Sequence, residues 1–178
     1  MPTKLWMAFL LGAALAAPAA APAQTGQDYL TQTEAEQIRD AESANERVKL
    51  FLDFGADRLR RFQYELHISK PGARQADYLN DLMDAFSACI DDADGRIKDA
   101  MSGGEDVREG IKLLRKRGAE FAAELKKIKA EGIELKLYQD SLDDAVQGLQ
   151  DAIADAEKAA KQIPSGSVKT KAHPGGHR

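Results

Sequence analysis

The fold is decided by residues 33–67, which read TEAEQIRDAESANERVKLFLDFGADRLRRFQYELH. Apolar or small residues recur there at alternating spacings of three and four, a pattern typical of a helix that buries one face. This seam consists of Ile38, Ala41, Asn45, Val48, Leu52, Gly55, Leu59, Phe62 and Leu66. It predicts one long helix that begins at a capping box, either Thr33-x-x-Glu36 or Thr31-x-x-Glu34, and ends near His67.

Three further segments carry the same pattern. Ser69-Lys70-Pro71-Gly72 interrupts the first helix, because proline cannot continue it. A second helix is predicted over 73–101, ended by Gly103-Gly104, and a third over 105–131, ended by Gly132 and capped at its start by Ser102-x-x-Glu105. A fourth is predicted over 135–163, where Pro164-Ser165-Gly166 stops it.

Four long amphipathic helices with short links predict an all-α fold, because such helices pack as antiparallel neighbours. The apolar period is nearer 3.5 than 3.6 in three of them, which favours coiled-coil-like packing. We therefore expect an antiparallel up-down-up-down bundle of four long helices. The alternative is an elongated pair of hairpins that completes its core by dimerising. Gly55 and Gly118 lie on seams, where glycine either permits close helix approach or is merely tolerated.

The first residues predict export. A positively charged start at Met1 to Lys4 precedes the apolar run Leu5 to Ala17, and Ala21-Pro22-Ala23 offers small residues to a signal peptidase. We expect residues 1–23 to be a cleaved signal peptide, since the apolar run is shorter than the ~20 residues that span a bilayer. The organisation predicted is a helical bundle domain over 24–163 and a disordered basic tail over 164–178. The protein is expected to be periplasmic or secreted, without stable membrane anchoring after cleavage.

Charge and cysteine content narrow the classes of function. Removal of Lys4 leaves 24 basic against 29 acidic residues, a net charge of −5, which disfavours nucleic acid as a partner. Cys89 is the single cysteine, so no intramolecular disulfide can form. We expect Cys89 to be a small buried apolar residue, with an intermolecular disulfide as the alternative.

The motifs of catalytic and metal-binding proteins do not fit. The run Asp91-Asp92-Ala93-Asp94-Gly95 resembles half of a calcium loop, but Met101 falls where a bidentate glutamate is needed, so we expect a solvated acidic face. His67 has no partner for a di-iron or haem site and is expected to stabilise a helix end. His173 and His177 offer at most a weak metal chelate. We predict no catalytic, cofactor or metal site, and hence a non-enzymatic protein.

An apolar stripe remains on the far side of the first predicted helix. On an ideal helical wheel, Leu50, Phe54 and Tyr64 fall opposite the seam, together with Arg61. Aromatic residues interleaved with arginine are typical of contact surfaces. We therefore predict that Leu50, Phe54, Arg61 and Tyr64 contact a protein partner or a second copy of the chain. The alternative is that the bundle packs differently and covers them, for example with the lead-in around Tyr29 or with this helix in a central position.

One short segment is similar to a known family. Leu30-Thr31-Gln32-Thr33-Glu34 resembles the Leu-Thr-x-x-Gln motif of small periplasmic helical stress chaperones, with Glu34 in place of the glutamine. The resemblance implies a chaperone or stress adaptor. The function predicted from the residues is a non-enzymatic structural or protein-interaction module. The alternatives are that chaperone and a small-ligand carrier that uses the bundle centre.

We predict that the exported protein begins at Gln24, because the small residues of Ala21-Pro22-Ala23 follow an apolar segment of signal-peptide length. Intact-mass measurement of the exported protein tests this. A mass that includes residues 1–23 would contradict it.

Overall fold

The structure, a computed structural model, describes residues 29–68 and 73–163. These residues form five α-helices, which pack against one another, and one short 3-10 helix, without a strand. The elements are α1 (Gln32–Asp40), α2 (Ala44–Ile68), α3 (Ala73–Gly103), α4 (Arg108–Glu131), η1 (Leu135–Leu137) and α5 (Gln139–Gln162). The prediction of an all-helical fold is confirmed. The predicted signal peptide and basic tail lie outside the described residues.

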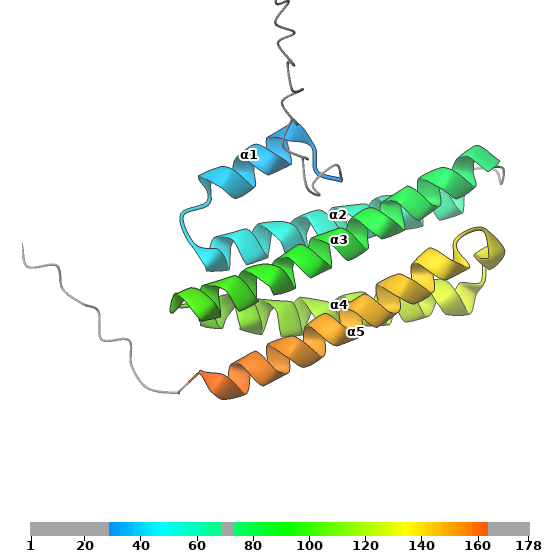
Figure 1. The fold of residues 1–178 in the computed structure, drawn as a ribbon. Helices are drawn as coiled ribbons and strands as arrows, with labels where there is room; N and C mark the ends of the chain where they lie inside the picture. Colours follow the sequence, from blue (N-terminus) through cyan, green and yellow to red (C-terminus); the bar gives the residue numbers. More distant parts are fainter. Residues whose placement is uncertain (1–28, 69–72, 164–178) are drawn as a thin grey trace, which may run out of the picture.

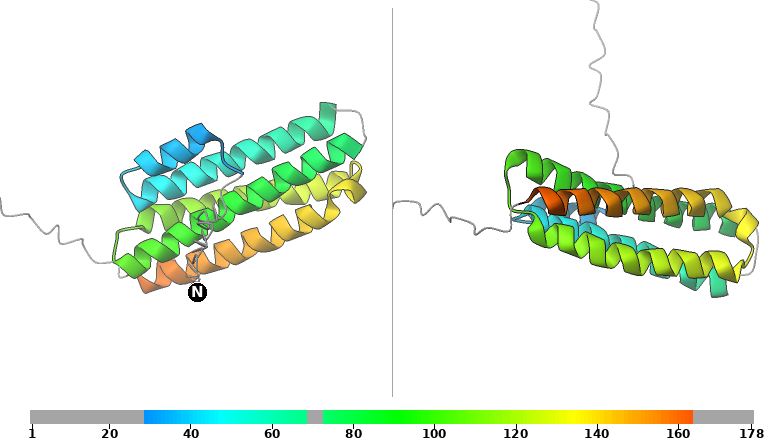
Figure 2. Two further views of the ribbon diagram at one scale, coloured as in Figure 1. Left: turned by 45° about the horizontal axis from the view of Figure 1, so that its top comes forward. Right: turned by 90° about the horizontal axis from the view of Figure 1, so that it is seen from below.

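Helices α2 to α5 lie alongside one another, and each runs in the opposite direction to the helix before it (Figure 1). Helix α3 packs against α2 and α5, and α4 packs against the same two helices. The short helix α1 lies on the outer side of α2, over the first half of that helix (Figures 1 and 2). The core therefore sits between α2, α3, α4 and α5, while α1 adds to one side.

The prediction of a single helix over 33–67 is wrong, because the chain breaks between α1 and α2. Ala41 is extended, with ψ 127°, and the hydroxyl of Ser43 accepts a hydrogen bond from the Glu46 N–H at 3.2 Å. The Glu46 carboxylate in turn accepts from the Glu42 N–H at 3.0 Å. These two hydrogen bonds cap the start of α2 and stabilise the turn that leads into it. Helix α1 itself begins with the capping box of Thr31 and Glu34, the second of the two predicted starts.

The glycines predicted to end helices do so, but two helices begin later than predicted. Gly104 and Gly132 both have positive φ, and Gly104 and Glu105 donate to the preceding turn as in a Schellman motif. The predicted Ser102 cap is wrong, because α4 begins later, at Arg108. The fourth long helix begins at Gln139 instead of 135.

The later start of α5 follows from the burial of Tyr138. This side chain is 1% exposed, and its hydroxyl donates to the Ile133 carbonyl at 2.8 Å. The preceding residues turn back as η1 so that this bond can form. The Tyr138 ring packs edge-on against Phe62, with 5.0 Å between ring centroids. A buried tyrosine hydroxyl needs such a partner, so the turn is a consequence of core packing.

Two asparagines hold the starts of α4 and α5. The Asn45 carboxamide, on α2, accepts from the Gly110 N–H at 2.7 Å and donates to the Asp106 carbonyl at 2.7 Å. The carboxamide of Asn80, on α3, donates to the Leu137 carbonyl at 2.9 Å and accepts from the Ser141 hydroxyl at 2.8 Å. Helices α4 and α5 have no side-chain hydrogen bond from their own N-cap residues, so neighbouring helices supply polar contacts at their starts.

Gly118 marks a close approach between helices, whereas Gly55 faces α3 at an ordinary contact distance. A Cβ atom at Gly55 would lie 3.4 Å from the Cys89 Cβ of α3. A Cβ at Gly118 would lie 2.7 Å from Cγ1 of Ile153 on α5. Close helix approach therefore explains Gly118, whereas at Gly55 both interpretations remain, because 3.4 Å is an ordinary van der Waals distance. Gly95, in contrast, has open space around the position of a Cβ.

We expect Gly95→Ala to raise the free energy of unfolding by about 0.5–1 kcal/mol, because alanine is the better helix former. The free energy of unfolding of Gly118→Ala should be lower than that of Gly95→Ala by about 1–3 kcal/mol, because the added methyl group meets Ile153. Urea denaturation measures both. The penalty of Gly118→Ala should shrink in an Ile153→Ala background, and an unchanged penalty would contradict this assignment.

Candidate functional site

The structure divides the predicted contact stripe of α2 into a covered half and an open half. Phe54 is 8% exposed and belongs to the core, and Leu50 is half-buried against it. The expected exposure of Phe54 is therefore wrong. Tyr64 is 60% exposed, and the Arg61 side chain is 59% exposed. The four residues lie on one side of α2, but only Arg61 and Tyr64 are freely accessible.

Helix α1 accounts for the covered half. Its buried residue Ile38 joins the same apolar cluster as Phe54, and Tyr29 and Leu30 pack against that cluster from the segment before α1. The antiparallel course of α1 and α2 places Ile38 near Phe54 when Glu34 is opposite Arg58, since both pairs are four residues apart. This arrangement agrees with the alternative given from the sequence, in which the segment around Tyr29 covers the stripe.

A buried ion pair anchors α1 on α2. The Arg58 guanidinium, with a side chain only 6% exposed, donates to both carboxylate oxygens of Glu34 at 2.6 Å. It also donates to the Tyr29 carbonyl at 3.1 Å. Bidentate pairing of this kind fixes geometry as well as charge. Arg58 therefore ties both α1 and the residues before it to α2.

Glu34 is held in its ionised form. Burial alone would raise its pKa, but hydrogen bonds from Arg58 and from the Thr31 backbone and hydroxyl outweigh burial and lower the pKa to about 2. The same carboxylate thus caps α1 and pairs with Arg58. Loss of its charge would weaken both contacts at once.

A second anchor joins the residues before α1 to α3. The Tyr29 hydroxyl donates a short hydrogen bond to the Asp92 carboxylate. Burial, followed by this hydrogen bond, raises the pKa of Tyr29 above its usual range. Cys89 lies close by on α3 and is fully buried, which confirms the expectation for this residue. Burial raises its pKa to about 12, so the thiol stays neutral and unreactive.

The open half of the stripe forms what we call the outer ridge of α2, defined as Asp57, Arg60, Arg61 and Tyr64. The Asp57 carboxylate pairs with Arg60 and, at 2.6 Å, with Arg61. Both guanidinium groups are nevertheless mostly exposed, so they stay available for further hydrogen bonds. The ridge presents two arginines and an aromatic ring on α2, directly beyond the N-terminal end of α1.

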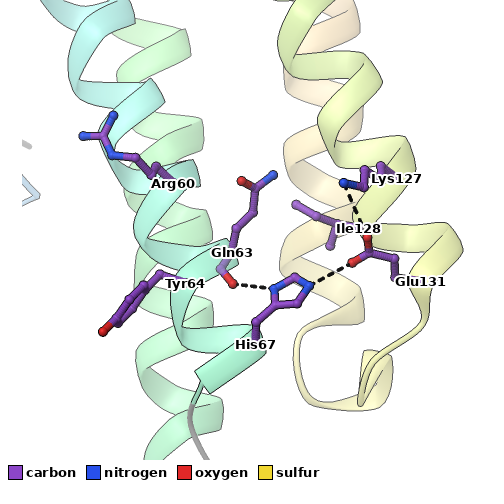
Figure 3. Close-up of a pocket in the computed structure, with 7 residues that line it drawn as sticks. All are labelled: Arg60, Gln63, Tyr64, His67, Lys127, Ile128 and Glu131. Atoms are coloured by element: carbon purple, nitrogen blue, oxygen red, sulfur yellow. Dashed lines mark hydrogen bonds and ion pairs between the residues drawn. The ribbon is translucent and has the colours of Figure 1, made fainter.

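Two shallow grooves flank the outer ridge. The first, of about 420 Å³, lies between α2 and α4 and is lined by Arg60 and Tyr64 among others (Figure 3). His67 reaches across it: its Nδ1–H donates to the Gln63 carbonyl at 2.7 Å, and its Nε2 lies 3.5 Å from Glu131. The position of His67 in the last turn of α2 confirms the expected helix-end placement.

The second groove, of about 590 Å³, lies between α2 and α3. Arg61 lines it from the ridge, and Tyr78, which is 42% exposed, lines it from α3. Tyr29 and Arg58 form its end beside α1. Sequence reasoning missed Tyr78 because this residue lies outside the stripe of the first helix. Two exposed aromatic rings thus lie in this region, Tyr64 on the ridge and Tyr78 on the far wall of the second groove.

The acidic run 91–95 is helical, as expected, but not fully solvated. Asp94 is 8% exposed, with one oxygen 2.5 Å from Lys98 Nζ and the other without a hydrogen bond in the structure. Burial raises its pKa above the usual range, although Lys98 opposes the change. Lys98 also contacts Asp155 at 2.8 Å, so the run helps to join α3 to α5. The expectation of a wholly solvated face is wrong for Asp92 and Asp94.

No protein-family model, curated protein or solved structure matches the chain. The segment that resembles the chaperone motif, 30–34, leads into α1 and contains its N-cap, Thr31, and Glu34, which serves as cap and ion-pair partner. Within 29–68 and 73–163, no three His, Cys, Asp or Glu side chains gather as a metal site. No helix in these ranges is long and apolar enough to cross a membrane. His173 and His177 lie outside them.

We expect Glu34→Gln to lower the free energy of unfolding at pH 7 by about 2–4 kcal/mol, because it leaves the buried Arg58 charge without its carboxylate. The folded-state pKa is depressed from 4.5 to about 2, so this stabilisation is present above pH 4.5 and is lost as pH falls towards 2. Urea denaturation from pH 7 to pH 2 should therefore show the two proteins converging.

Lys49→Gln is the matched control, because Lys49 pairs with Asp53 on the exposed surface of the same helix. We expect Lys49→Gln to lower the free energy of unfolding by no more than about 1 kcal/mol. The double variant Glu34→Leu with Arg58→Met should recover most of the loss, since it removes both buried charges. Equal effects of Glu34→Gln and Lys49→Gln would contradict the anchoring role.

Proposed function

We propose that this chain is an exported, non-enzymatic helical bundle that acts as a protein-interaction module through the outer ridge of α2. The proposal includes cleavage after Ala23 and a periplasmic or secreted location. It also includes the architecture of an antiparallel up-down-up-down four-helix bundle with coiled-coil-like packing, formed by α2 to α5. Helix α1 is an addition to that bundle.

The observation that carries the proposal is the exposure of Tyr64, which is 60%, beside two mostly exposed arginines. Large aromatic rings and arginines are the residue types that contribute most to binding energy at protein interfaces. The flanking grooves give a partner's side chains places to enter on both sides of the ridge. Tyr78 adds a second exposed ring at the border of one groove.

Charge favours a partner with acidic groups at its contact surface. The whole chain has a net charge of −4, yet Arg60, Arg61 and Lys127 gather at the ridge and the groove beside it. A local basic patch on an acidic protein orients an acidic partner towards that patch. Asp57 and Glu131 offset part of this charge, and Asp81 and Asp84 line the second groove, so the excess of positive charge is confined to the side of the ridge that faces α4.

The carrier alternative receives less support from the centre of the helices. The seam glycines that could have left room for a ligand face Cys89, Phe86 and Ile153 at van der Waals distance or closer. The edge-to-face pair of Phe86 and Phe121, with 5.4 Å between ring centroids, fills the same region. Both grooves are open surface features beside the ridge.

A photo-crosslinking amino acid at position 64 tests the proposal in cells that export the protein. We expect a defined adduct from position 64 and no such adduct from position 150, an exposed site on α5. Arg61→Ser with Tyr64→Ser should reduce capture of the same partner at least about tenfold, the effect of losing 1.4 kcal/mol of binding energy.

The double variant should unfold within about 0.5 kcal/mol of the parent, because both side chains are exposed. This separates lost binding from lost folding. Identical adducts from positions 64 and 150, or full capture by the double variant, would overturn the proposal.

A further inference from the structure

Helices α3 and α5 lie side by side and run in the same direction (Figure 1). Three contacts set their alignment, and the two residues of each pair are separated by nearly the same distance in sequence. Asn80 bonds Ser141, Asp91 lies over Gly148, and Lys98 binds Asp155. The surface between these contact points therefore belongs to both helices along most of their length.

Exposed carboxylates line this surface. We call them the acidic stripe, defined as Asp84 and Asp91 of α3 with Asp144 and Asp151 of α5. Asp91 is itself a contact point, and the other three lie three or four residues from a contact point of their own helix, which places them on the same helix face. Within 29–68 and 73–163, none of these carboxylates forms an ion pair. The stripe therefore presents a row of negative charges to solvent.

A buried carboxylate adds to the negative charge beneath the stripe. Asp94 is 8% exposed, and its Oδ1 accepts no hydrogen bond from the residues that the structure describes. Lys98 binds the other oxygen of Asp94 but also binds Asp155, so one ammonium group serves two carboxylates. Burial, followed by the like charges of Asp94 and Asp92, raises the pKa of Asp91 above its usual range. This surface thus carries more negative charge than its own bases neutralise.

The chain itself contains a segment of the opposite charge. Residues 164–178 read PSGSVKTKAHPGGHR, with the basic side chains Lys169, Lys171 and Arg178 and without an acid. They follow α5, whose last residues lie at the same end of the molecule as those of α3 (Figure 1). Pro164 and Gly166 are residue types that suit a reversal of chain direction. A basic segment is therefore attached beside one end of the acidic stripe.

The length of this segment matches the length of the stripe. Asp151 lies about 18 Å from the end of α5 and Asp144 about 28 Å, at ~1.5 Å per residue of helix. An extended chain covers about 3.3 Å per residue, so Lys171 reaches about 26 Å beyond Ile163, and Arg178 reaches about 50 Å. The basic residues can therefore reach every carboxylate of the stripe.

We propose that residues 164–178 fold back and bind along the acidic stripe of the same molecule. The two lysines of the segment then lie near Asp91 and Asp151. Single ion pairs at a protein surface are weak, but a segment tethered by a few residues has a local concentration of about millimolar, which favours binding within one molecule. The stripe lies on α3 and α5 and the outer ridge on α2, so this inference does not depend on the proposed function.

A nitroxide spin label on Ala172→Cys of the full chain tests the proposal by nuclear magnetic resonance. Cys89 is fully buried, so the label reacts at position 172 alone. We expect the label to broaden the amide signals of Asp91 and Asp151 but not that of Arg60 on the outer ridge. Raising the salt concentration from 0.1 M to 1 M shortens the Debye length from about 10 Å to about 3 Å and should remove the broadening.

Charge reversal in the segment tests which residues carry the binding. Lys169→Glu with Lys171→Glu should weaken the broadening at least about fivefold, as expected for two lost surface ion pairs. Lys112→Glu with Lys116→Glu is the matched control, because it changes the net charge equally through exposed residues of α4. This control should keep the broadening of the parent. Equal losses in the two variants would show a general effect of net charge and overturn the proposal.

Neutral variants of the stripe test the other side of the contact. Asp91→Asn with Asp151→Asn should remove most of the broadening without unfolding the protein, because both side chains are exposed. Glu120→Gln with Glu124→Gln, at exposed positions of α4, is the matched control and should retain it.

Three results would overturn the proposal. The first is the absence of broadening at both stripe positions in the parent. The second is full broadening in the Asp91→Asn, Asp151→Asn variant. The third is broadening that arises only between a spin-labelled molecule and a separate isotope-labelled molecule, since this would assign the segment to the stripe of a second copy.

Discussion

The buried guanidinium of Arg58 is the constraint around which the N-terminal half of the molecule is arranged. A charge with a side chain only 6% exposed requires a matched partner, and Glu34 is that partner. The need to bring Glu34 to Arg58 sets where α1 lies, how the link turns and which part of α2 is covered. The cap of α1 depends on the same carboxylate, so helix formation and docking of α1 are coupled.

The position of α1 also defines the surface that is left for other molecules. One side of α2 carries apolar and arginine residues along most of its length, but α1 covers only the part up to Arg58. Beyond it, Arg60, Arg61 and Tyr64 face solvent between two grooves. The contact with α1 and the proposed partner surface thus share one helix face. The first uses a desolvated ion pair, and the second consists of mostly exposed side chains.

Local patterns in the sequence predicted most helices but missed the contacts between distant residues. The seams around Leu114 and Leu142 and the helix-ending glycines Gly104 and Gly132 follow from spacing and backbone preference alone. The break at 41–43 had a local signal, Ser43-x-x-Glu46, but the continuous seam concealed it. Residue type alone would not reveal that α1 returns to α2, because Arg58 and Glu34 are 24 residues apart.

The candidate site was predicted in part for the same reason. Tyr64 and Arg61 are exposed as the helical wheel indicated, since no segment within 29–68 and 73–163 folds over that part of α2. Phe54 is buried because a separate helix covers it. A helical wheel drawn for one helix contains no information about such a neighbour. Tyr78, which lines the second groove, and Lys127, which lines the first, come from α3 and α4, so their proximity to the ridge depends on packing between helices.

The asparagines at the two ends of the molecule have a consequence for how it comes apart. Asn45 satisfies the Gly110 N–H, and Asn80 bonds the Leu137 carbonyl and the Ser141 hydroxyl, so side chains of α2 and α3 hold the starts of α4 and α5. If α4 and α5 separated from the rest, their first turns would lose these partners as well as the apolar contacts. Neither hairpin is therefore an independent unit. The four long helices form one cooperative whole, in which loss of either pair removes support from the other.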